Sequence, residues 1–138
     1  MTLAVTEDEV RRILAESPFI GIYGFQLHSL GDGESSIQFP YQEKFLRPGD
    51  VISGPVYMAA ADATMWLAIM TKLGDAATLA VTVEMKTNFL SGAKREGFIC
   101  TAKILKLGAR LIYGVAECVS DSGKLLTHHT VTYIRASS

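Results

Sequence analysis

The run of apolar residues from Val56 to Met70 is the most distinctive hydrophobic pattern in the chain. Its sequence is VYMAAADATMWLAIM, and Asp62 is the one charged side chain in it. A membrane span normally needs about 18 or more uninterrupted apolar residues, and a carboxylate near its middle is costly in lipid. We therefore predict a helix over about residues 54–72 that is buried inside a soluble protein.

Elsewhere, apolar and polar residues alternate, which is typical of strands. Over residues 78–90 the apolar face carries Leu79, Val81, Val83 and Met85, and the polar face carries Thr82, Glu84, Lys86 and Asn88. Further strands are predicted over residues 97–108, 110–120 and 124–135, and residues 19–30 and 34–42 form a predicted hairpin around the turn sequence GDG. The last connections are too short for crossover helices, so we expect antiparallel pairing.

The N-terminal segment is predicted to be a short amphipathic helix. Thr6 and Glu9 match a capping box, and the segment lacks the cationic start and apolar run of a signal peptide. A central helix that is apolar on nearly every side must be surrounded, and a sheet is the only element available to do so. We predict an α+β fold in which an antiparallel sheet of five to six strands wraps around one long central helix, as a single domain over residues 1–138.

Composition narrows the classes of function. The 138 residues are 49% hydrophobic and 20% charged, with a formal net charge of -1. These values argue against disorder, and we expect neither nucleic acid nor membrane as a partner. Cys100 and Cys118 lack the spacing of a zinc site, so we expect no metal. A reduced, cytoplasmic environment fits two isolated cysteines.

The start of the central helix has the features of a site that binds a negatively charged oxygen. Ser53 is a favoured N-cap residue, Gly54 allows a ligand to approach the backbone, and Pro55 suits the first helical turn. Free N–H groups and the positive end of the helix dipole point towards whatever precedes the helix. The alternative is an ordinary helix start.

Asp62 is the second candidate for chemistry. A carboxylate among alanines and methionines suits a general base, and the alternative is a buried Asp that accepts structural hydrogen bonds. The three histidines lie in predicted strands without triad or metal spacing, and Trp66, Tyr113 and Tyr133 are expected to be core aromatics. Basic residues near the predicted strand ends, Lys94, Arg95 and Arg110, are candidates for binding phosphate, or else solvated side chains.

The element order and the stretch SGPVYMAAADA resemble the hotdog-fold acyl-CoA thioesterases. The resemblance is to the phenylacetate-degradation subgroup of the 4-hydroxybenzoyl-CoA thioesterase-like superfamily, in which the helix opens with H-G-G and the catalytic acid comes nine residues after the histidine. Here Ser53, Gly54 and Pro55 occupy the H-G-G positions, and Asp62 is the ninth residue after Ser53. The resemblance extends from about Leu30 to Ile134.

The resemblance implies hydrolysis of an acyl-CoA thioester, with no cofactor beyond the coenzyme A of the substrate. Asp62 would be the general base or nucleophile, and the Gly54 N–H would polarise the thioester carbonyl. Thr82 would hold the attacking water or the carboxylate, although strict alternation places it on the wrong face of its strand unless the strand bulges. The implied sites lie between subunits of a homodimer, which can pair further into a homotetramer.

Substrate-binding positions are implied in the same way. Coenzyme A phosphates would meet Lys94, Arg95 and Arg110, and the remaining positions are Arg47, Pro55 and Asn88. Three residues depart from the family pattern, because Ser53 replaces histidine, Pro55 replaces glycine and Arg47 replaces asparagine. Ser53 is expected to donate to the leaving sulfur or to cap the helix.

Three other functions remain open from the sequence. A hydroxyacyl-thioester dehydratase is disfavoured, because those enzymes place a histidine where this chain has Leu46 and Arg47. A noncatalytic acyl-CoA binding module would keep the fold without needing the Asp62 carboxylate. A protein-interaction domain would bind no small ligand.

Overall fold

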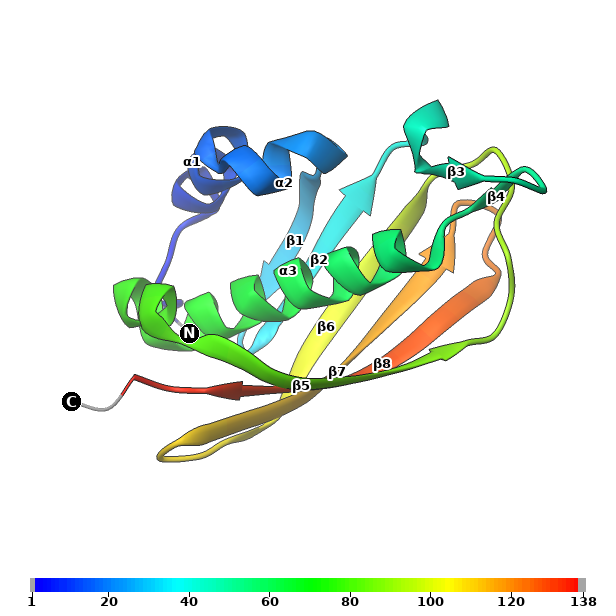
Figure 1. The fold of residues 1–138 in the computed structure, drawn as a ribbon. Coiled ribbons are helices and arrows are strands. Elements are labelled where there is room, and N and C mark those ends of the chain that lie inside the picture. The colour runs from blue at the N-terminus through cyan, green and yellow to red at the C-terminus, as the bar shows by residue number, and fades with distance from the viewer. Residues whose placement is uncertain (1, 137–138) are drawn as a thin grey trace.

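A six-stranded antiparallel sheet curls around one long helix in the computed structural model, which describes residues 2–136 (Figure 1). The helices are α1 (Glu7–Glu16), α2 (Pro18–Tyr23) and α3 (Gly54–Leu73), with 3₁₀ turns at Glu43–Phe45 and Gly74–Leu79. The large sheet contains β1 (Gln26–Gly31), β2 (Glu34–Phe39), β5 (Val81–Phe89), β6 (Phe98–Leu107), β7 (Leu111–Ser120) and β8 (Leu125–Ile134), in the order β1-β2-β6-β7-β8-β5. A separate two-stranded sheet pairs β3 (Leu46–Arg47) with β4 (Val51–Ile52). The α+β prediction is confirmed.

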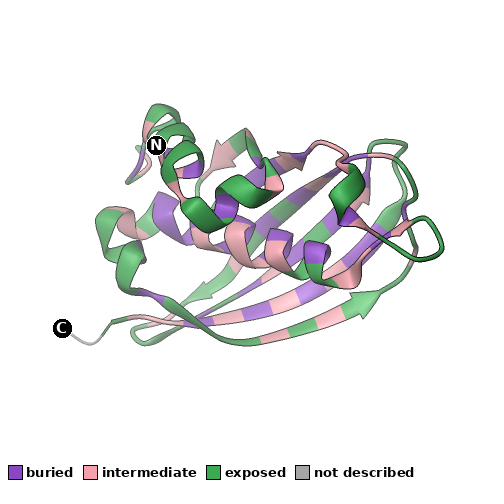
Figure 2. Ribbon diagram, turned by 45° about the horizontal axis from the view of Figure 1, so that its top comes forward, coloured by how far each residue is buried: buried purple, intermediate pink, exposed green. Residues whose placement is uncertain are grey.

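The central helix α3 is buried along most of its length, as its apolar sequence predicts. Figure 2 shows the buried residues gathered on α3 and on the strands beneath it. Small residues allow the helix to lie close to the sheet: Ala60 and Ala61 are fully buried. On the sheet side, a Cβ at Gly114 would lie 2.5 Å from the Met65 methyl carbon. Close packing therefore fixes both the depth and the direction of α3.

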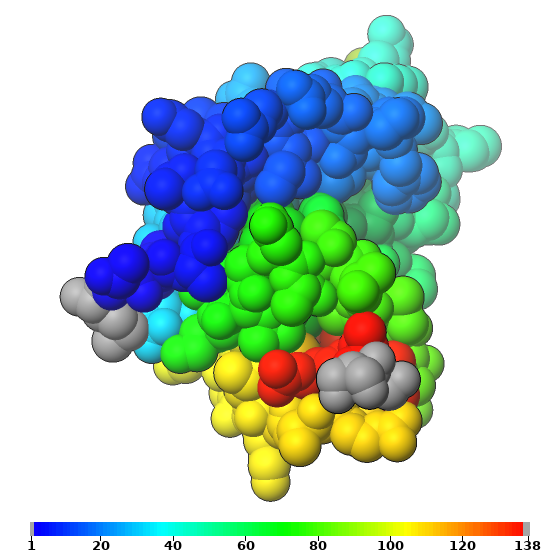
Figure 3. Space-filling view, turned by 90° about the vertical axis from the view of Figure 1, so that its left-hand side faces the viewer, coloured from blue at the N-terminus to red at the C-terminus, as the bar shows by residue number. Residues whose placement is uncertain are grey.

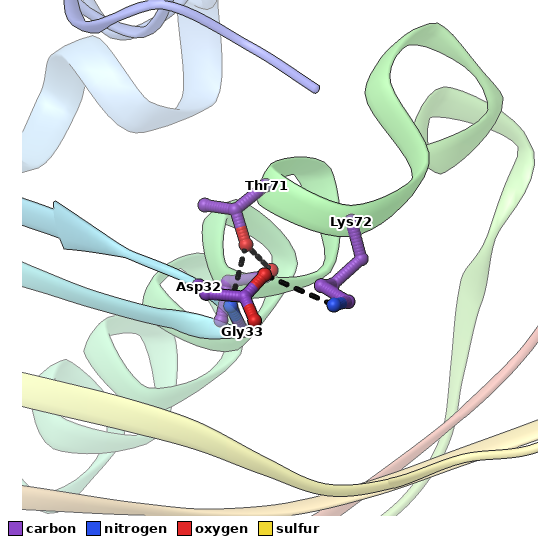
Figure 4. Close-up of polar contacts among 5 residues, drawn as sticks. Asp32, Gly33, Thr71 and Lys72 are labelled. Carbon is purple, nitrogen blue, oxygen red and sulfur yellow. Dashed lines mark hydrogen bonds and ion pairs between the residues drawn. The ribbon is translucent and has the colours of Figure 1, made fainter. Parts of the chain in front are cut away.

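The C-terminal end of α3 is tied to the turn between β1 and β2. Lys72 Nζ lies 2.9 Å from Asp32 Oδ1, and the Gly33 N–H donates to Thr71 Oγ1 at 3.0 Å (Figure 4). The Thr71 hydroxyl in turn donates to the backbone oxygen of Ala68. These bonds satisfy polar groups where helix and hairpin meet, so the far end of α3 is anchored away from its N-terminus.

The N-terminal segment lies on one side of α3 and the C-terminal strands lie on the other (Figure 3), and α1 packs against β1. The predicted capping box at the start of α1 is present, with Thr6 Oγ1 accepting from the Glu9 N–H and Glu9 accepting from the Thr6 N–H. Val10 and Leu14 are the buried residues of α1. The short amphipathic helix is therefore confirmed.

One predicted strand is wrong in its first half. Residues 18–23 form α2, and strand β1 begins only at Gln26. Pro18 starts the helix at its first turn, and Gly24 ends it in the left-handed conformation with φ 65°. The Gln42 amide then donates to the Tyr23 backbone oxygen at 2.8 Å. Proline and glycine in these positions outweigh the strand-like alternation of the residues between them.

The strand of residues 81–89 also differs from its prediction. The apolar positions Val81 and Val83 are more than half exposed, as is Leu79 just before the strand, and Met85 alone of the predicted apolar face is partly buried. The pairing of β5 with β8 shifts register between Thr82 and Glu84, which is a bulge. β5 is one of the two edge strands of the sheet, so its exposed valines and its free backbone groups have no partner within residues 2–136.

No helix within residues 2–136 is both long and apolar enough to cross a membrane.

Candidate active site

The N-terminus of α3 presents a free backbone donor. Gly54 is the first residue of the helix, and no acceptor within residues 2–136 bonds its N–H. The Phe89 ring packs on Gly54 so closely that an added Cβ would lie 3.1 Å from Phe89 Cε1. Only glycine accommodates this ring without a shift, and the donor is left available for a carbonyl oxygen.

The two residues beside Gly54 do not add a free backbone N–H donor. Ser53 occupies the N-cap position, but its side chain makes no cap hydrogen bond. Its N–H donates to the Phe45 oxygen at 2.8 Å, which holds the entry to the helix. Pro55 follows within the first turn and has no N–H. Gly54 is therefore the free donor of this helix start, and the Ser53 hydroxyl is left for another partner.

A hollow of about 450 Å³ opens in front of Gly54, and we name it the helix-mouth hollow. Its lining residues are Arg47, Val51, Ile52, Gly54, Tyr57, Phe89, Leu90, Ser91 and Gly92. Arg47 is exposed and its guanidinium donates to the Pro48 oxygen at 2.7 Å. The Tyr57 hydroxyl is buried and has no hydrogen-bond partner among residues 2–136. Burial raises the pKa of Tyr57 to about 12. The nearby Ala93 backbone lowers this pKa by less than burial raises it, and its distance or angle does not meet the criteria for a hydrogen bond.

The Asp62 carboxylate is held by two hydroxyl groups. Thr82 Oγ1 donates to Asp62 Oδ1 at 2.6 Å, and the Tyr133 hydroxyl donates to the same oxygen at 2.7 Å. Tyr133 also donates to the backbone oxygen of Asp62 at 3.0 Å. No hydrogen bond in the described part of the chain uses Oδ2. One oxygen is thus fixed, and the other is free to accept a proton or to attack.

The bulge in β5 explains how Thr82 reaches Asp62. Strict alternation would place Thr82 on the face away from α3. The register shift between Thr82 and Glu84 inserts an extra residue, which turns Thr82 towards the helix. Thr82 and Tyr133 are direct partners in the β5–β8 ladder, so both hydroxyls arrive from one position in the sheet.

Tyr133 belongs to the candidate site, whereas the sequence alone predicts only a core aromatic. It is 4% exposed, so that expectation is correct for its ring. Burial raises the pKa of Tyr133 far above its ordinary value, and the charge of Asp62 raises it further. The phenol therefore stays protonated and donates. The sequence does contain a signal for this contact, because a buried tyrosine hydroxyl needs an acceptor and Asp62 is the only carboxylate in α3.

Asp62 and Tyr133 open onto a second hollow, of about 420 Å³, which we name the Asp62 hollow. Its lining residues are Phe19, Ile20, Met58, Ala59, Asp62, Ala63, Trp66, Met85 and Tyr133. Asp62 is the only charged residue among them. The arrangement is a carboxylate with one fixed and one free oxygen, at the wall of an apolar cavity.

The two hollows are separate within one chain. They have no lining residue in common. Gly54 and Asp62 are eight residues apart on α3, which corresponds to about 12 Å along the helix axis. Two groups this far apart cannot both contact the carbonyl of one small substrate. A complete site therefore needs a second source for one of them.

The predicted basic cluster is not brought together in one chain. Lys94 and Arg95 precede β6, and Arg110 follows it, so a ten-residue strand of roughly 33 Å separates them. Arg95 is already paired, with its guanidinium 3.1 Å from Asp50 Oδ1 and 3.2 Å from the Tyr41 hydroxyl. The charge of Asp50 raises the pKa of Arg95. Asn88 is exposed and lines neither hollow, whereas its neighbour Phe89 does.

His128 and His129 make structural contacts within the sheet. His129 is fully buried between the hydroxyls of Thr87 and Thr127, at 2.8 and 2.7 Å, and His128 Nδ1 lies 2.9 Å from Glu117. The prediction that they are ordinary strand histidines is confirmed. Within residues 2–136, no group of three or more His, Cys, Asp or Glu side chains is arranged to hold a metal ion. Tyr113 is 41% exposed, so its prediction as a core aromatic is wrong.

Comparison with known sequences places this architecture among characterised families. The sequence profile of the thioesterase superfamily matches residues 49–127, which include the start of α3, Asp62 and Thr82. A protein of Saccharolobus solfataricus, provisionally described as an esterase, is 36% identical over 97 residues, covering 70% of this chain and 68% of the relative.

Solved structures show the same fold. Thioesterase superfamily member 2 of zebrafish superposes with a TM-score of 0.86 at 24% identity, covering 96% of this chain and 99% of that one. A variant of the phenylacetic acid degradation protein of Thermus thermophilus superposes with a TM-score of 0.77 at 24% identity, covering 87% and 100% of the two chains. At these identities the two structures establish the fold alone.

Proposed function

Because the chain belongs to the thioesterase superfamily, we propose that it hydrolyses an acyl-CoA thioester to a carboxylic acid and coenzyme A. The observation that carries this proposal is the Asp62 carboxylate, held on Oδ1 by Thr82 and Tyr133 and free on Oδ2 beside an apolar hollow. A structural Asp would have both oxygens paired or solvated away from a cavity. The spacing of Ser53 and Asp62 favours the phenylacetate-degradation subgroup.

The chemistry needs a base or nucleophile, a carbonyl-polarising donor and a leaving thiolate. As base, Asp62 Oδ2 takes a proton from a water whose oxygen attacks the thioester carbon; as nucleophile, Oδ2 attacks directly. The carbonyl oxygen becomes negatively charged and is stabilised by the Gly54 N–H at the helix N-terminus. Collapse breaks the C–S bond, and the thiolate of coenzyme A leaves and takes up a proton: on the general-base route, the one that Asp62 accepted from water. On the nucleophile route the acyl group remains on Asp62 as a mixed anhydride, and a water molecule then cleaves it to release the carboxylic acid and restore the Asp62 carboxylate. Neither step requires a metal or a redox cofactor.

We propose that Gly54 and Asp62 of one site come from two subunits of a homodimer. β5 is a nine-residue edge strand whose outer side is unpaired within residues 2–136; Thr82 near its start contacts Asp62, and Phe89 at its end packs on Gly54. If two β5 edges pair antiparallel around a two-fold axis, the Phe89 end of one strand lies beside the Thr82 end of the other. This pairing brings each Gly54 towards the Asp62 of the second subunit and makes two composite sites.

The test is a thiol-release assay on a panel of acyl-CoA thioesters. The parent is expected to release coenzyme A, and Asp62→Asn and Asp62→Ala are expected to lose about 10²- to 10⁴-fold in kcat, the usual range for a general acid–base group. Treatment with EDTA is expected to leave the rate unchanged. If no thioester is hydrolysed, or if both Asp62 variants match the parent, the proposal is wrong. Binding of acyl-CoA without turnover would then identify a noncatalytic module.

A further inference from the structure

The α2 helix is placed to form part of the Asp62 site. Phe19 and Ile20 line the Asp62 hollow together with Met58 and Trp66 of α3. An adjoining hollow between α2 and the start of β5 shares Phe19, Ile20, Trp66 and Tyr133 with it. The carboxylate therefore lies at one end of a continuous apolar surface that includes both helices.

The position of α2 is fixed by specific contacts, so the surface is built into the fold. Gln42 caps the helix at Tyr23, and the Tyr23 ring stacks on Phe25 at a centroid distance of 5.1 Å. Phe19 packs edge-on against Tyr23 at 5.4 Å yet remains 62% exposed. An aromatic ring anchored on one side and exposed on the other leaves a large apolar surface beside the site.

The charges around this surface favour one class of ligand. Asp62 is the only charged residue among those lining the two adjoining hollows, and neither is lined by lysine, arginine or histidine. A carboxylate on the acyl group of the substrate would be repelled by the Asp62 carboxylate, and no lining cation would offset that repulsion. An uncharged hydrocarbon group meets only apolar walls there.

We propose that α2 is the wall of an acyl-binding pocket, and that the substrates are thioesters with an uncharged hydrocarbon acyl group. This inference rests on the proposed thioester hydrolysis and identifies its substrate class. Phe19 and Trp66 are the specificity-determining residues. Their rings contact the acyl chain beyond its carbonyl carbon, so they affect long acyl groups more than acetyl.

Phe19 and Ile22 make a matched pair of variants on the same helix. Both are more than half exposed, but only Phe19 lines the hollows. Because each buried methylene contributes about fourfold in binding, we expect kcat/KM for octanoyl-CoA to exceed that for acetyl-CoA by at least about tenfold. Phe19→Ala is expected to raise KM for octanoyl-CoA about fivefold and to leave acetyl-CoA within about twofold. Ile22→Ala is expected to match the parent, and succinyl-CoA to be the poorest substrate.

Trp66 supplies a readout that does not depend on turnover. It is the only tryptophan in the chain, it lines both hollows, and its Nε1–H donates to the Ala77 oxygen at 2.8 Å. In the Asp62→Asn variant, octanoyl-CoA is expected to change the Trp66 emission, and coenzyme A alone is expected to leave it unchanged.

The two measurements separate the inference from the proposed function. If octanoyl-CoA changes the Trp66 emission but no thioester is hydrolysed, the acyl pocket stands and the hydrolase proposal falls. If thioesters are hydrolysed but Phe19→Ala and Ile22→Ala behave alike, or succinyl-CoA is preferred, the pocket assignment is wrong and the hydrolase stands. A Phe19→Ala variant that changes only the oligomeric state, seen by size-exclusion chromatography, also overturns the pocket.

Discussion

Two hydroxyls on a single oxygen of Asp62 define the chemistry available at this residue. Thr82 and Tyr133 both donate to Oδ1, which orients the carboxylate plane and leaves Oδ2 without a hydrogen bond in the part of the chain that the structure describes. Because burial raises the pKa of Tyr133 far above its usual range, the phenol remains a donor at neutral and moderately alkaline pH. In the proposed hydrolysis, Thr82 and Tyr133 are positioning residues that act through Asp62.

Removing either hydroxyl is expected to lower kcat about 10- to 100-fold with little change in KM, because the orientation of Asp62 matters mainly in the transition state. The variants are Tyr133→Phe and Thr82→Val, and Thr82→Ser is the control that keeps the donor. Steady-state kinetics with one acyl-CoA measure the effect. A loss expressed wholly in KM, or a Thr82→Ser variant as slow as Thr82→Val, would contradict a positioning role.

Tyr57 makes the stability of the protein depend on alkaline pH. Its folded pKa is raised to about 12, above the ordinary value of about 10 in the unfolded chain. A raised folded pKa gives stability that is complete below pH 10 and is lost as the pH rises towards 12, by up to about 2 kcal/mol. Tyr133 adds a loss in the same direction.

Tyr57→Phe removes a buried hydroxyl that has no partner, so we expect it to maintain or raise the free energy of unfolding at pH 7. Between pH 10 and 12 the variant is expected to lose less stability than the parent. Chemical denaturation at pH 7 and at several points above pH 10 measures both effects. Destabilisation at pH 7 by more than about 1 kcal/mol would show that the hydroxyl has a partner in solution.

At the level of the elements, α2 shows how two residues decide between helix and strand. Apolar and polar residues alternate weakly from Phe19 to Tyr23, which predicts a strand. The segment is instead a single short helix that begins at Pro18 and ends before Gly24. Gly24 has φ 65°, and an added Cβ would lie 2.7 Å from Gln42 Nε2. The end of α2 and its cap by Gln42 therefore both depend on the absence of a side chain at Gly24.

Gly24→Ala is expected to destabilise the protein by about 1–2 kcal/mol, through the left-handed backbone and the displaced Gln42 cap. Gly21 lies inside the same helix with nothing within 4 Å of an added Cβ, so Gly21→Ala is the matched control. We expect it to be neutral or to stabilise by up to about 1 kcal/mol. Thermal unfolding of both variants tests the pair, and equal melting temperatures would argue against α2 as described.

Much of the fold follows from the periodicity of the sequence. The apolar run predicts α3 to within a residue at each end, and alternation predicts β6, β7 and β8 and their antiparallel pairing. The sidedness of β5 does not follow, because a bulge inverts the faces after Thr82 and because Val81 and Val83 face away from the core as edge-strand residues. Periodicity carries no information on bulges or on edges.

The sequence predicts the two central residues of the candidate site, Gly54 and Asp62, but it does not predict which residues from the strands contact them. Gly54 and Asp62 are evident from glycine at a helix start and from a lone carboxylate in an apolar helix. Tyr133 reaches Asp62 across 71 residues of sequence, a contact that depends on strand order and register. Lys94, Arg95 and Arg110 are predicted to cluster because each lies near the end of a strand, but the whole of β6 separates the first two from the third.

At the level of the whole molecule, a single chain carries both halves of the chemistry but keeps them apart. The hydrogen-bond donor and the carboxylate lie about 12 Å apart along α3 and face hollows without a common residue. The exposed edge of β5 connects the two halves, since one end contacts Asp62 through Thr82 and the other covers Gly54 through Phe89. The proposed two-fold pairing of this edge would complete two sites at once.

Two variants of Gly54 isolate its N–H from its small size. Gly54→Pro removes the donor, and the extended backbone of Ser53 (φ -65°, ψ 138°) suits a residue before proline. Gly54→Ala keeps the donor but adds the same Cβ against the Phe89 ring. We expect Gly54→Pro to lose about 10²- to 10³-fold in kcat, as when one oxyanion donor is removed, and Gly54→Ala to lose less. If both variants lose kcat to a similar extent, the loss comes from disturbed packing against the Phe89 ring and not from the missing N–H.

Complementation between two inactive variants tests the composite site most directly. Asp62→Ala and Gly54→Pro chains are mixed, unfolded and refolded together, and thiol release is measured once mass spectrometry shows mixed dimers. A mixed dimer contains one site built from the intact Asp62 of one chain and the intact Gly54 of the other. About a quarter of parental activity is expected, because half of randomly paired dimers are mixed and one of their two sites is intact. If each site lies within one chain, no mixed dimer contains an intact site, and activity that stays at the level of the separate variants would contradict the account.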